Sequence, residues 1–471
     1  MKPSYLLLGL GFALVVFFSS FHLFNSPETW LDEGLIIQSA VGLLHTGKAA
    51  LPVAPGVYEP AWYITTGFPV TVPLAGTFAI FGVSLEAARM VMLVFLLCFY
   101  AALFLYSRKA IGGMAAWFGF FLLVFFGPIY GDGRNVLGEV PGLLCMLVAL
   151  LPLMQGGELT RARAILAGVG AGLAFAAKPI FILFLPALLL AVVFRHKELN
   201  LKKIFIFGVL GVLLPVALWV FTQFDTVALS RVLAVYANPH DVNVGGALLA
   251  NVKRFFTELQ PLFFLSALFV WIGSYAVRRF RRETIPLTEE ALLFFSVLVL
   301  LAYLRTAGYY RYFFPGQVFA LLYLPQALTY LARGLHPYLS RAVIVFLCGL
   351  MLFQAYETAF RSWTAVHYDS THTASFERYF ASLPAGEEVF AYQAPEAMTF
   401  MGAHPAYQFV QITPSLSAGD AYVSRIRSGQ TPRIITTINA FNANTDDVFS
   451  RYAISETLGN YVILIPKAKR P

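Results

Sequence analysis

Charged residues are scarce in this chain, and cysteines are almost absent. Only 12% of the 471 residues are Asp, Glu, Lys or Arg, whereas 58% are hydrophobic, and the mean hydropathy is +0.70. This balance excludes an ordinary soluble globular domain. The three cysteines lie in apolar runs without metal-ligand spacing, which argues against a disulfide framework and a structural zinc site: Cys98, Cys145 and Cys348.

Long apolar blocks take the place of the missing charge. Only helices and closed barrels satisfy all their backbone hydrogen bonds in lipid, and these blocks are continuous rather than alternating ten-residue strands. The sequence therefore predicts a helical protein that crosses the membrane many times. The first block, "YLLLGLGFALVVFFSSFHLF", exceeds a signal-peptide core and lacks a small-residue cleavage site, so we expect it to remain as the first span.

Basic residues predict how the chain is threaded. The net charge of +8 is interpreted as orientation rather than nucleic-acid binding, because Lys and Arg gather on the cytoplasmic side of membrane proteins. The predicted cytoplasmic clusters are Arg108 and Lys109, Arg161 and Arg163, Arg195 to Lys203, Arg278 to Arg282, and Arg333 to Arg341. Eleven spans satisfy this rule, near residues 4–23, 90–106, 114–130, 141–154, 164–178, 180–194, 204–222, 262–277, 289–304, 315–332 and 341–357. The amino terminus is then cytoplasmic and the carboxyl terminus extracytoplasmic.

Two segments fall outside this scheme. Residues 61–83 are apolar but contain Pro69 and Pro73, so we expect helices in the outer membrane interface, with an ordinary span as the alternative. Residues 359–471 are too polar to cross the membrane. Three short strand-like pieces, "EEVFAY", "PRIITTI" and "YVILIP", alternate with helix-like ones and predict a small extracytoplasmic α/β domain, which follows a transmembrane domain of residues 1–358.

Ionisable residues on the predicted outer face are the candidates for a functional site. Charges near a membrane are costly and tend to face a cavity or the bundle interior. Five separate outer loops contribute them: Asp32, Glu33 and Glu59; Asp132, Arg134 and Glu139; Lys178; His240; and Arg305 and Arg311 with Tyr309 and Tyr312. Acids on early loops and cations on late ones suit a reaction in which a carboxylate activates a hydroxyl and cations hold a phosphate leaving group.

Each candidate also has a structural interpretation. Asp32 and Glu33 suit the first turn of a helix. Asp132 suits a turn between glycines. Arg134 and Glu139 suit a loop salt bridge, and Lys178 suits contact with headgroups. Arg305, Arg311 and the tyrosines suit an interfacial belt. His240 suits a solvated loop, with proton transfer or metal binding as alternatives.

Five ordered motifs carry a family resemblance over residues 1–335. They are "WLDEG" after the first span, "GVSLEAARM", "YGDGRNVLGE", "AAKPIF" between two spans, and "YRYFFP" late in the chain. Together they resemble the GT-C membrane glycosyltransferases, in particular the bacterial branch that includes protein O-mannosyltransferase-like and aminoarabinose transferase-like enzymes.

The resemblance implies a function and roles for residues. It implies transfer of a sugar, with inversion, from a polyprenyl-phosphate carrier to an acceptor at the outer face of the bacterial cytoplasmic membrane. It assigns Asp32 as general base with Glu33 beside it, Asp132 as the second-loop acid, and Lys178, Arg311 and Tyr312 near the carrier phosphate. The pattern departs at "YEPAWY", where Glu59 stands before a single proline in place of the Lys-Pro-Pro of aminoarabinose transferases. The acceptor therefore stays open between protein, lipid A and glycan.

No cofactor is expected. Asp32, Asp132 and Glu139 offer oxygen ligands for a divalent cation, but the late-loop cations already suit a phosphate, so a metal is not favoured. The alternative function is a transporter or flippase of lipid-linked sugars. Such proteins usually have related halves and polar groups at the bilayer midplane, whereas these charges gather at one face.

Overall fold

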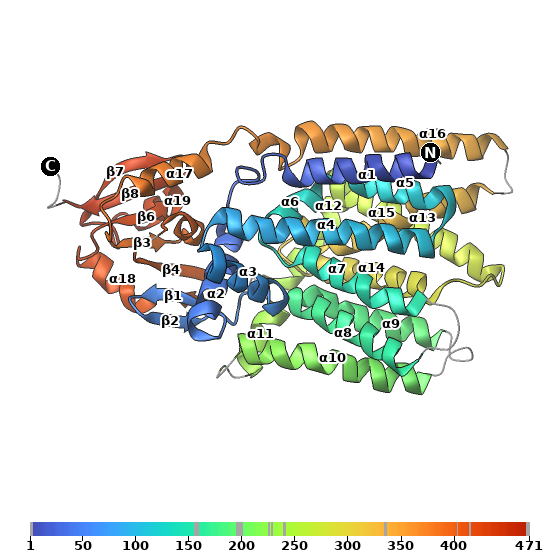
Figure 1. Cartoon of the computed structure of the whole chain (residues 1–471), viewed down its shortest axis with the longest axis horizontal. Helices are drawn as coiled ribbons and strands as arrows, with labels where there is room; N and C mark the ends of the chain where they lie inside the picture. Colours follow the sequence, from blue (N-terminus) through green and yellow to red (C-terminus); the bar gives the residue numbers. More distant parts are fainter. Residues whose placement is uncertain are drawn as a thin grey trace.

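A bundle of long helices forms most of the molecule. The computed structural model describes residues 3–154, 160–194, 201–224, 227, 229–238, 242–333, 337–402, 404–413 and 416–467. Each of the eleven predicted spans contains a helix, and these helices lie side by side in Figure 1. They are α1 (Pro3–Ser20), α4 (Leu85–Ala110), α5 (Gly113–Val124), α7 (Glu139–Leu150), α8 (Arg161–Ala177), α9 (Phe184–Val193), α10 (Leu201–Gln223), α13 (Leu259–Phe280), α14 (Leu287–Leu304), α15 (Phe314–Ala332) and α16 (Pro337–Tyr356).

Length and composition separate these helices into two groups. Within the described residues, five helices are long and apolar enough to cross a membrane, or six if one bent pair counts as a single span. Shorter apolar helices, among them α1 and α9, fall below that length. The helices indicate a multi-pass membrane protein, while eleven crossings and their orientation stay a prediction.

The bent pair corrects the prediction for residues 114–130. Helix α5 ends at Val124, and α6 (Gly127–Arg134) continues at an angle of 54°. Phe126 is extended, and Pro128 occupies the first turn of α6, where a missing N–H is tolerated. The break turns α6 away from α5 before the chain reaches Asp132.

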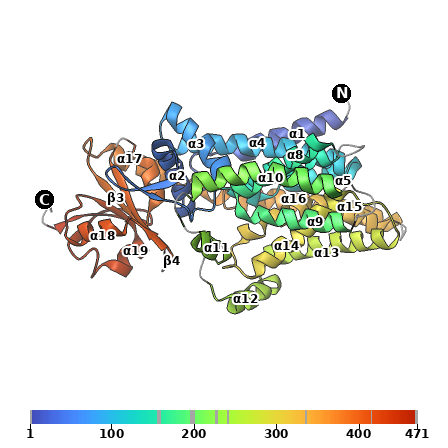
Figure 2. The same ribbon diagram turned by 90° about the horizontal axis from the view of Figure 1, so that it is seen from below.

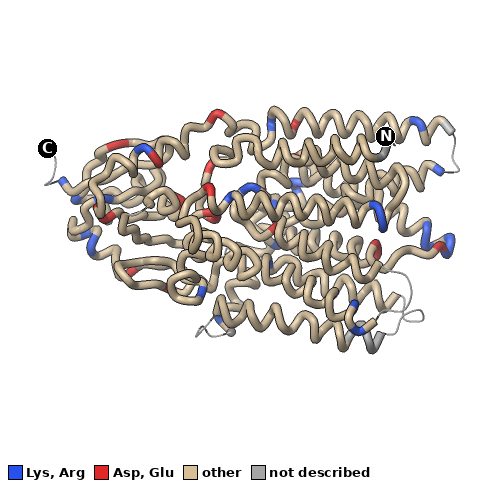
Figure 3. Tube along the Cα trace, viewed as in Figure 1, with Lys and Arg blue, Asp and Glu red and all other residues tan. Residues whose placement is uncertain are grey.

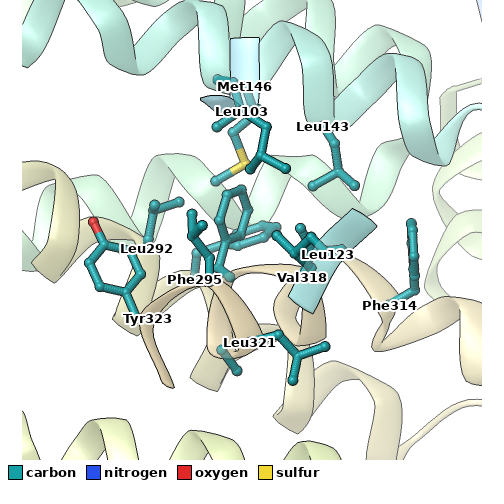
Figure 4. Close-up of a cluster of buried hydrophobic side chains, with 14 of the residues drawn as sticks. Leu103, Leu123, Leu143, Met146, Leu292, Phe295, Phe314, Val318, Leu321 and Tyr323 are labelled. Atoms are coloured by element: carbon teal, nitrogen blue, oxygen red, sulfur yellow. The ribbon is translucent and has the colours of Figure 1, made fainter. Parts of the chain in front are cut away.

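The core of the bundle is aliphatic and aromatic. Figure 4 shows Leu103 of α4, Leu123 of α5 and Leu143 of α7 facing Phe295 of α14 and side chains of α15. These leucines and Phe295 are fully buried. Because packed apolar surface of this kind fixes how neighbouring helices cross, the core sets the positions at which their ends emerge.

The loop predicted to be the first outer loop, residues 24–89, contains more structure than the sequence predicted. It forms α2 (Leu31–Thr46), a hairpin of β1 (Ala50–Ala54) and β2 (Val57–Pro60), and α3 (Phe68–Phe81). Helix α3 has 14 residues and is about 21 Å long, which is short of a hydrocarbon core of about 30 Å. A helix is therefore present in residues 61–83 but, like α1 and α9, falls below the length of a full span, and its location in the outer interface stays a prediction.

The C-terminal region contains a six-stranded sheet in the order β5-β4-β3-β6-β8-β7. Its strands are β3 (Val389–Tyr392), β4 (Ala406–Thr413), β5 (Leu416–Ala418), β6 (Ile434–Thr437), β7 (Tyr452–Leu458) and β8 (Tyr461–Pro466). Strand β3 pairs in parallel with β4 and β6, and β8 pairs antiparallel with β6 and β7. The helices of this region are α17 (His372–Ala381), η6 (Pro395–Phe400), α18 (Asp420–Arg427) and α19 (Ile438–Asn444). The three predicted strand pieces form β3, β6 and β8, so the α/β prediction is confirmed.

The sheet and the first outer loop occupy the same end of the bundle. In Figure 1, α2 lies between the sheet and the helices, and the hairpin lies beside β4; Figure 2 shows α2 in the same place from a second direction. Helices α11 (Leu229–Ala237) and α12 (Val244–Thr257) link α10 to α13 beside this end. In Figure 3, Lys and Arg gather at helix ends on the opposite side. The predicted functional loops and the C-terminal region thus meet at one end of the molecule.

Candidate active site

The acid pair of the first outer loop lies in the first turn of α2. Trp30 is the extended residue before the helix, so Asp32 and Glu33 follow directly at its amino end. The partial positive charge at a helix amino terminus favours carboxylates there. The two side chains have different surroundings: the Asp32 side chain is 27% exposed, whereas that of Glu33 is 0% exposed.

Glu33 forms a buried ion pair with Arg89 of α4. The guanidinium donates from Nε to Glu33 Oε1 at 3.1 Å and from NH2 to Glu33 Oε2 at 2.9 Å. Both side chains are fully buried. Arg89 also donates to the carbonyls of Leu23 and Pro27, each at 2.8 Å. Because its oxygens are occupied and hidden from solvent, Glu33 is placed to hold the loop rather than to meet a substrate.

Asp32 pairs instead with Arg311 of the late loop, 279 residues away in the sequence. The Arg311 side chain is 15% exposed and lies in η3 (Tyr310–Tyr312). Although burial alone lowers the pKa of Arg311, the carboxylates of Asp32 and Glu139 raise it above its ordinary value. The guanidinium therefore stays charged.

Aromatic rings surround the Arg311 guanidinium. Its central carbon lies 5.1 Å from the ring centre of Trp30 and 5.5 Å from those of Tyr309 and Tyr312. Cations are attracted to the faces of aromatic rings, and planar guanidinium groups also stack on them. The rings restrict the orientation of the group and leave Nε buried, without a hydrogen-bond partner among the described residues.

A second charged group lies beside this pair. Lys178 Nζ is 3.1 Å from Glu139 Oε1, and their side chains are 9% and 1% exposed. Lys178 precedes Pro179 and is extended, which ends α8 and turns the chain. Burial raises the pKa of Asp132 of α6 to about 8; the nearby charge of Glu139 adds to this rise, and the charges of Arg311 and Lys178 oppose it. Three carboxyl groups and two cations from four loops at this end of the bundle thus form one cluster: Asp32, Asp132, Glu139, Lys178 and Arg311.

The other predicted site residues lie elsewhere or serve the scaffold. Arg134 is buried and donates to the carbonyls of Ser19, Ser26 and Phe21, so the loop salt bridge considered for Arg134 and Glu139 is wrong. Glu59 accepts a hydrogen bond of 3.1 Å from the Gly419 amide and joins β2 to the C-terminal region.

Two further predictions have different outcomes. Arg305 is exposed and donates to the Ala237 carbonyl at 2.7 Å, away from the acids of the cluster. His240 lies outside the described residues. In the described part of the chain, no group of three or more His, Cys, Asp or Glu side chains is arranged to hold a metal ion.

Sequence reasoning missed the residues that support the cluster. Arg89 stands inside the quoted "EAARM" motif, and Trp30 precedes the acid pair, but neither received a role. Asn251 of α12 donates to the carbonyls of Tyr303, Leu304 and Thr306 and so fixes the late loop. The available signal was an arginine beside a long apolar run, because a charge that becomes buried in a helix bundle requires a partner.

Comparison with known proteins agrees with this architecture. Residues 70–221 match the family model described as dolichyl-phosphate-mannose-protein mannosyltransferase. No curated protein is significantly similar in sequence. The chain is structurally similar to ArnT from Cupriavidus metallidurans bound to undecaprenyl phosphate, with a TM-score of 0.61 and 13% identity. The match covers 100% of this chain and 99% of ArnT.

An archaeal enzyme has a similar structure. The Archaeoglobus fulgidus oligosaccharyltransferase in complex with Zn and sulfate matches with a TM-score of 0.59 and 13% identity, covering 95% of this chain and 71% of that one. A structure of AglB from the same organism, with an inhibitory peptide and a dolichol-phosphate, matches with a TM-score of 0.53 and 14% identity, covering 100% and 75%. The chain therefore has the fold of the GT-C glycosyltransferases, and the resemblance seen in its motifs is confirmed.

Proposed function

We propose that this protein is an inverting glycosyltransferase that moves a sugar from a polyprenyl-phosphate carrier to an acceptor hydroxyl. The observation that carries the proposal is the environment of Arg311, which donates to Asp32 while its buried Nε has no hydrogen-bond partner among the described residues. An unused guanidinium N–H suits a phosphate oxygen, and the half-buried carboxylate beside it suits a hydroxyl. One site then contains both groups that the transfer needs.

The proposed reaction proceeds in one displacement. Asp32 accepts the proton of the acceptor hydroxyl while the oxygen of that hydroxyl forms a bond to the anomeric carbon of the sugar. The bond from that carbon to the carrier phosphate oxygen breaks, and its electron pair leaves with polyprenyl phosphate. Attack from the face opposite the leaving group inverts the anomeric centre. Arg311 and Lys178 stabilise the negative charge that develops on the phosphate.

The carrier phosphate also changes the state of Asp32. In the structure Asp32 and Arg311 neutralise each other. A phosphate that binds the Arg311 guanidinium competes for its N–H donors and weakens its hold on Asp32, which becomes a better base. Asp132 and Glu139, beside Lys178, are assigned to holding that lysine and shaping the site.

The relatives support the type of donor. The similar structures contain undecaprenyl phosphate in ArnT and dolichol-phosphate in AglB, and the matching family model is named for a dolichyl-phosphate-linked sugar. We assign the protein to the bacterial cytoplasmic membrane, with a cytoplasmic amino terminus. The end with the cluster and residues 359–471 is assigned to the outer side, opposite the basic helix ends of Figure 3. The acceptor is a protein, lipid A or glycan hydroxyl.

The same geometry supports a reaction without a metal ion. The carboxylates of Asp32 and Glu139 already have cationic partners in Arg311 and Lys178. A divalent ion at these oxygens has to displace both cations. We therefore propose that the two side chains supply the positive charge for the leaving phosphate.

The donor class is tested with purified protein in lipid nanodiscs and membranes from a deletion strain as the source of acceptor. A labelled sugar that is linked to polyprenyl monophosphate should give free polyprenyl phosphate and an acceptor that carries the labelled sugar with its anomeric configuration inverted. The same sugar linked to a nucleotide should give no product. Use of the nucleotide donor, or retention of configuration, contradicts the proposal. Movement of intact lipid-linked sugar across the bilayer, without bond cleavage, supports the flippase alternative instead.

A further inference from the structure

The segment that carries Asp32 is held by residues far along the chain. We name residues 24–34 the acid segment and residues 362–396 the brace. Four side-chain hydrogen bonds join them: Ser26 Oγ to the Thr364 carbonyl (2.5 Å), Thr373 Oγ1 to the Phe24 carbonyl (3.2 Å), Ser370 Oγ to Glu28 Oε1 (2.5 Å) and Thr29 Oγ1 with His372 Nε2 (3.1 Å). The brace thus follows the acid segment over most of its length.

The contact continues into α2, where the two chains touch through their backbones. A Cβ atom on Gly34 would lie 2.2 Å from the Glu396 amide nitrogen and 2.4 Å from Glu396 Cα. Both distances are far below a van der Waals contact, and neither atom belongs to a flexible side chain. Gly34 is two residues after Asp32 on the same helix. The position of the first turn of α2 therefore depends on η6 of the brace.

A second line of contact runs from the brace to the cation. The rings of Trp363 and Trp30 meet edge to face with centroids 5.9 Å apart. Trp30 in turn covers the Arg311 guanidinium at 5.1 Å. Among the ring and hydrogen-bond contacts of the described residues, none joins Trp363 to Arg311 directly, so the influence of Trp363 on the cation passes through Trp30.

From these contacts we infer that the brace positions both reacting groups of the site, with Gly34 setting the place of Asp32 and Trp363 setting that of Trp30 over Arg311. The C-terminal region is then part of the catalytic apparatus and not an appended module. The inference rests on the proposed function, because it assigns a cause to the geometry of the base and of the phosphate-binding cation. Gly34 and Trp363 are positioning residues.

Gly34→Ala tests the first half of the inference. The added methyl has to push α2 away from η6, and a misplacement of about 1 Å at a reacting group lowers turnover by about 100-fold. We expect kcat for sugar transfer to fall by that factor, and the donor KM to rise by no more than the factor of about ten expected for Trp363→Ala, because Trp30 directly precedes α2 and moves with it. Gly349→Ala is the matched control, since this helical glycine of α16 has open space around its Cβ position.

Trp363→Ala tests the second half. Loss of the edge contact frees Trp30, and we expect the donor KM to rise by about tenfold, while Trp363→Phe restores most of the loss. Phe360→Ala, at a side chain that is 68% exposed, should leave both constants unchanged. A loss in kcat alone, with no rescue by phenylalanine, contradicts the assigned role.

The outcomes separate this inference from the proposed function. If Asp32→Asn is inactive but Gly34→Ala and Trp363→Ala turn over like the wild type, the brace does not position the site and the function stands. If Asp32→Asn retains full turnover, the function itself is wrong. If Gly34→Ala does not fold, as judged by thermal unfolding and size-exclusion chromatography, the Trp363 series decides the inference.

Discussion

The stability of the junction between the brace and α2 should depend on pH, because Glu396 has a buried carboxyl group at this junction. The side chain is 3% exposed, and its Oε1 accepts a hydrogen bond of 2.5 Å from the Tyr461 hydroxyl. Oε2 has no hydrogen-bond partner among the described residues. Burial raises the pKa of Glu396 from 4.5 to about 7, against the lowering effect of the Tyr461 hydrogen bond, and the Glu33 charge adds to the rise.

The sign and size of the effect follow from this shift. Because the folded pKa lies above the unfolded one, the folded protein binds the proton more tightly, and stability is lost as the pH rises from 4.5 through about 7. At 1.36 kcal/mol for each pKa unit, the loss is about 3 kcal/mol. Glu396→Gln is neutral at every pH and keeps an oxygen for Tyr461. The variant should therefore be more stable than the wild type by up to about 3 kcal/mol above pH 7 and similar to it near pH 4.5.

Amide hydrogen exchange measures this change in stability locally, in the peptides around Glu396. Exchange of the peptides that cover residues 389–400 should accelerate in the wild type between pH 5 and 8, beyond the intrinsic dependence of exchange on pH, and should not do so in Glu396→Gln. Glu456→Gln, at an exposed position of β7, should behave like the wild type. An equal pH dependence in Glu396→Gln and wild type refutes the reasoning, because it places the titrating group elsewhere.

Three further predictions concern the cluster and the ion pair that supports it. Arg89→Leu leaves Glu33 buried without its partner and should destabilise the protein by about 3 to 5 kcal/mol. The control Arg427→Leu, at an exposed arginine, should cost less than about 1 kcal/mol. Equal thermal unfolding of the two variants would contradict the scaffold role of Arg89. Arg311→Ala should raise the donor KM by about 10- to 100-fold, because the carrier phosphate loses a charged hydrogen-bond donor. The control Arg305→Ala should leave the donor KM unchanged. A similar rise in both variants would contradict the assignment of Arg311 to the phosphate site. A chelator of divalent cations should leave turnover of the purified enzyme unchanged, and loss of activity that Mg²⁺ or Mn²⁺ restores would show that the two cations are not sufficient.

The helical architecture could be predicted because it depends on local composition. Continuous apolar blocks identify helices in lipid, and alternating strand-like pieces identified β3, β6 and β8. Two of the strands that were missed lack that signal, because β5 has three residues and β7 is largely exposed, whereas β4 is rich in aromatic and β-branched residues and could have been predicted. The break after Val124 was also missed, although Gly127 and Pro128 mark it in the sequence.

The cluster could be predicted only in part. Charge on the outer loops was visible in the sequence, and the positive-inside rule brought the loops to one end. Which acid meets which cation depends on tertiary packing. Asp32 and Glu33 are neighbours, but one faces the late loop and the other faces α4, because successive helical positions point in directions about 100° apart. The backbone contact between Gly34 and η6 joins residues more than 350 positions apart and leaves no local trace.

Turnover of Asp32→Asn tests the central claim most directly. The substitution keeps the size and hydrogen-bonding capacity of the side chain and removes its charge and its basicity. With a polyprenyl-monophosphate-linked sugar, release of polyprenyl phosphate should fall by at least about 1000-fold, while Asp446→Asn, at an exposed acid of the C-terminal region, should retain wild-type turnover. Wild-type turnover in folded, membrane-inserted Asp32→Asn would contradict the account, because the cluster would then lack its base.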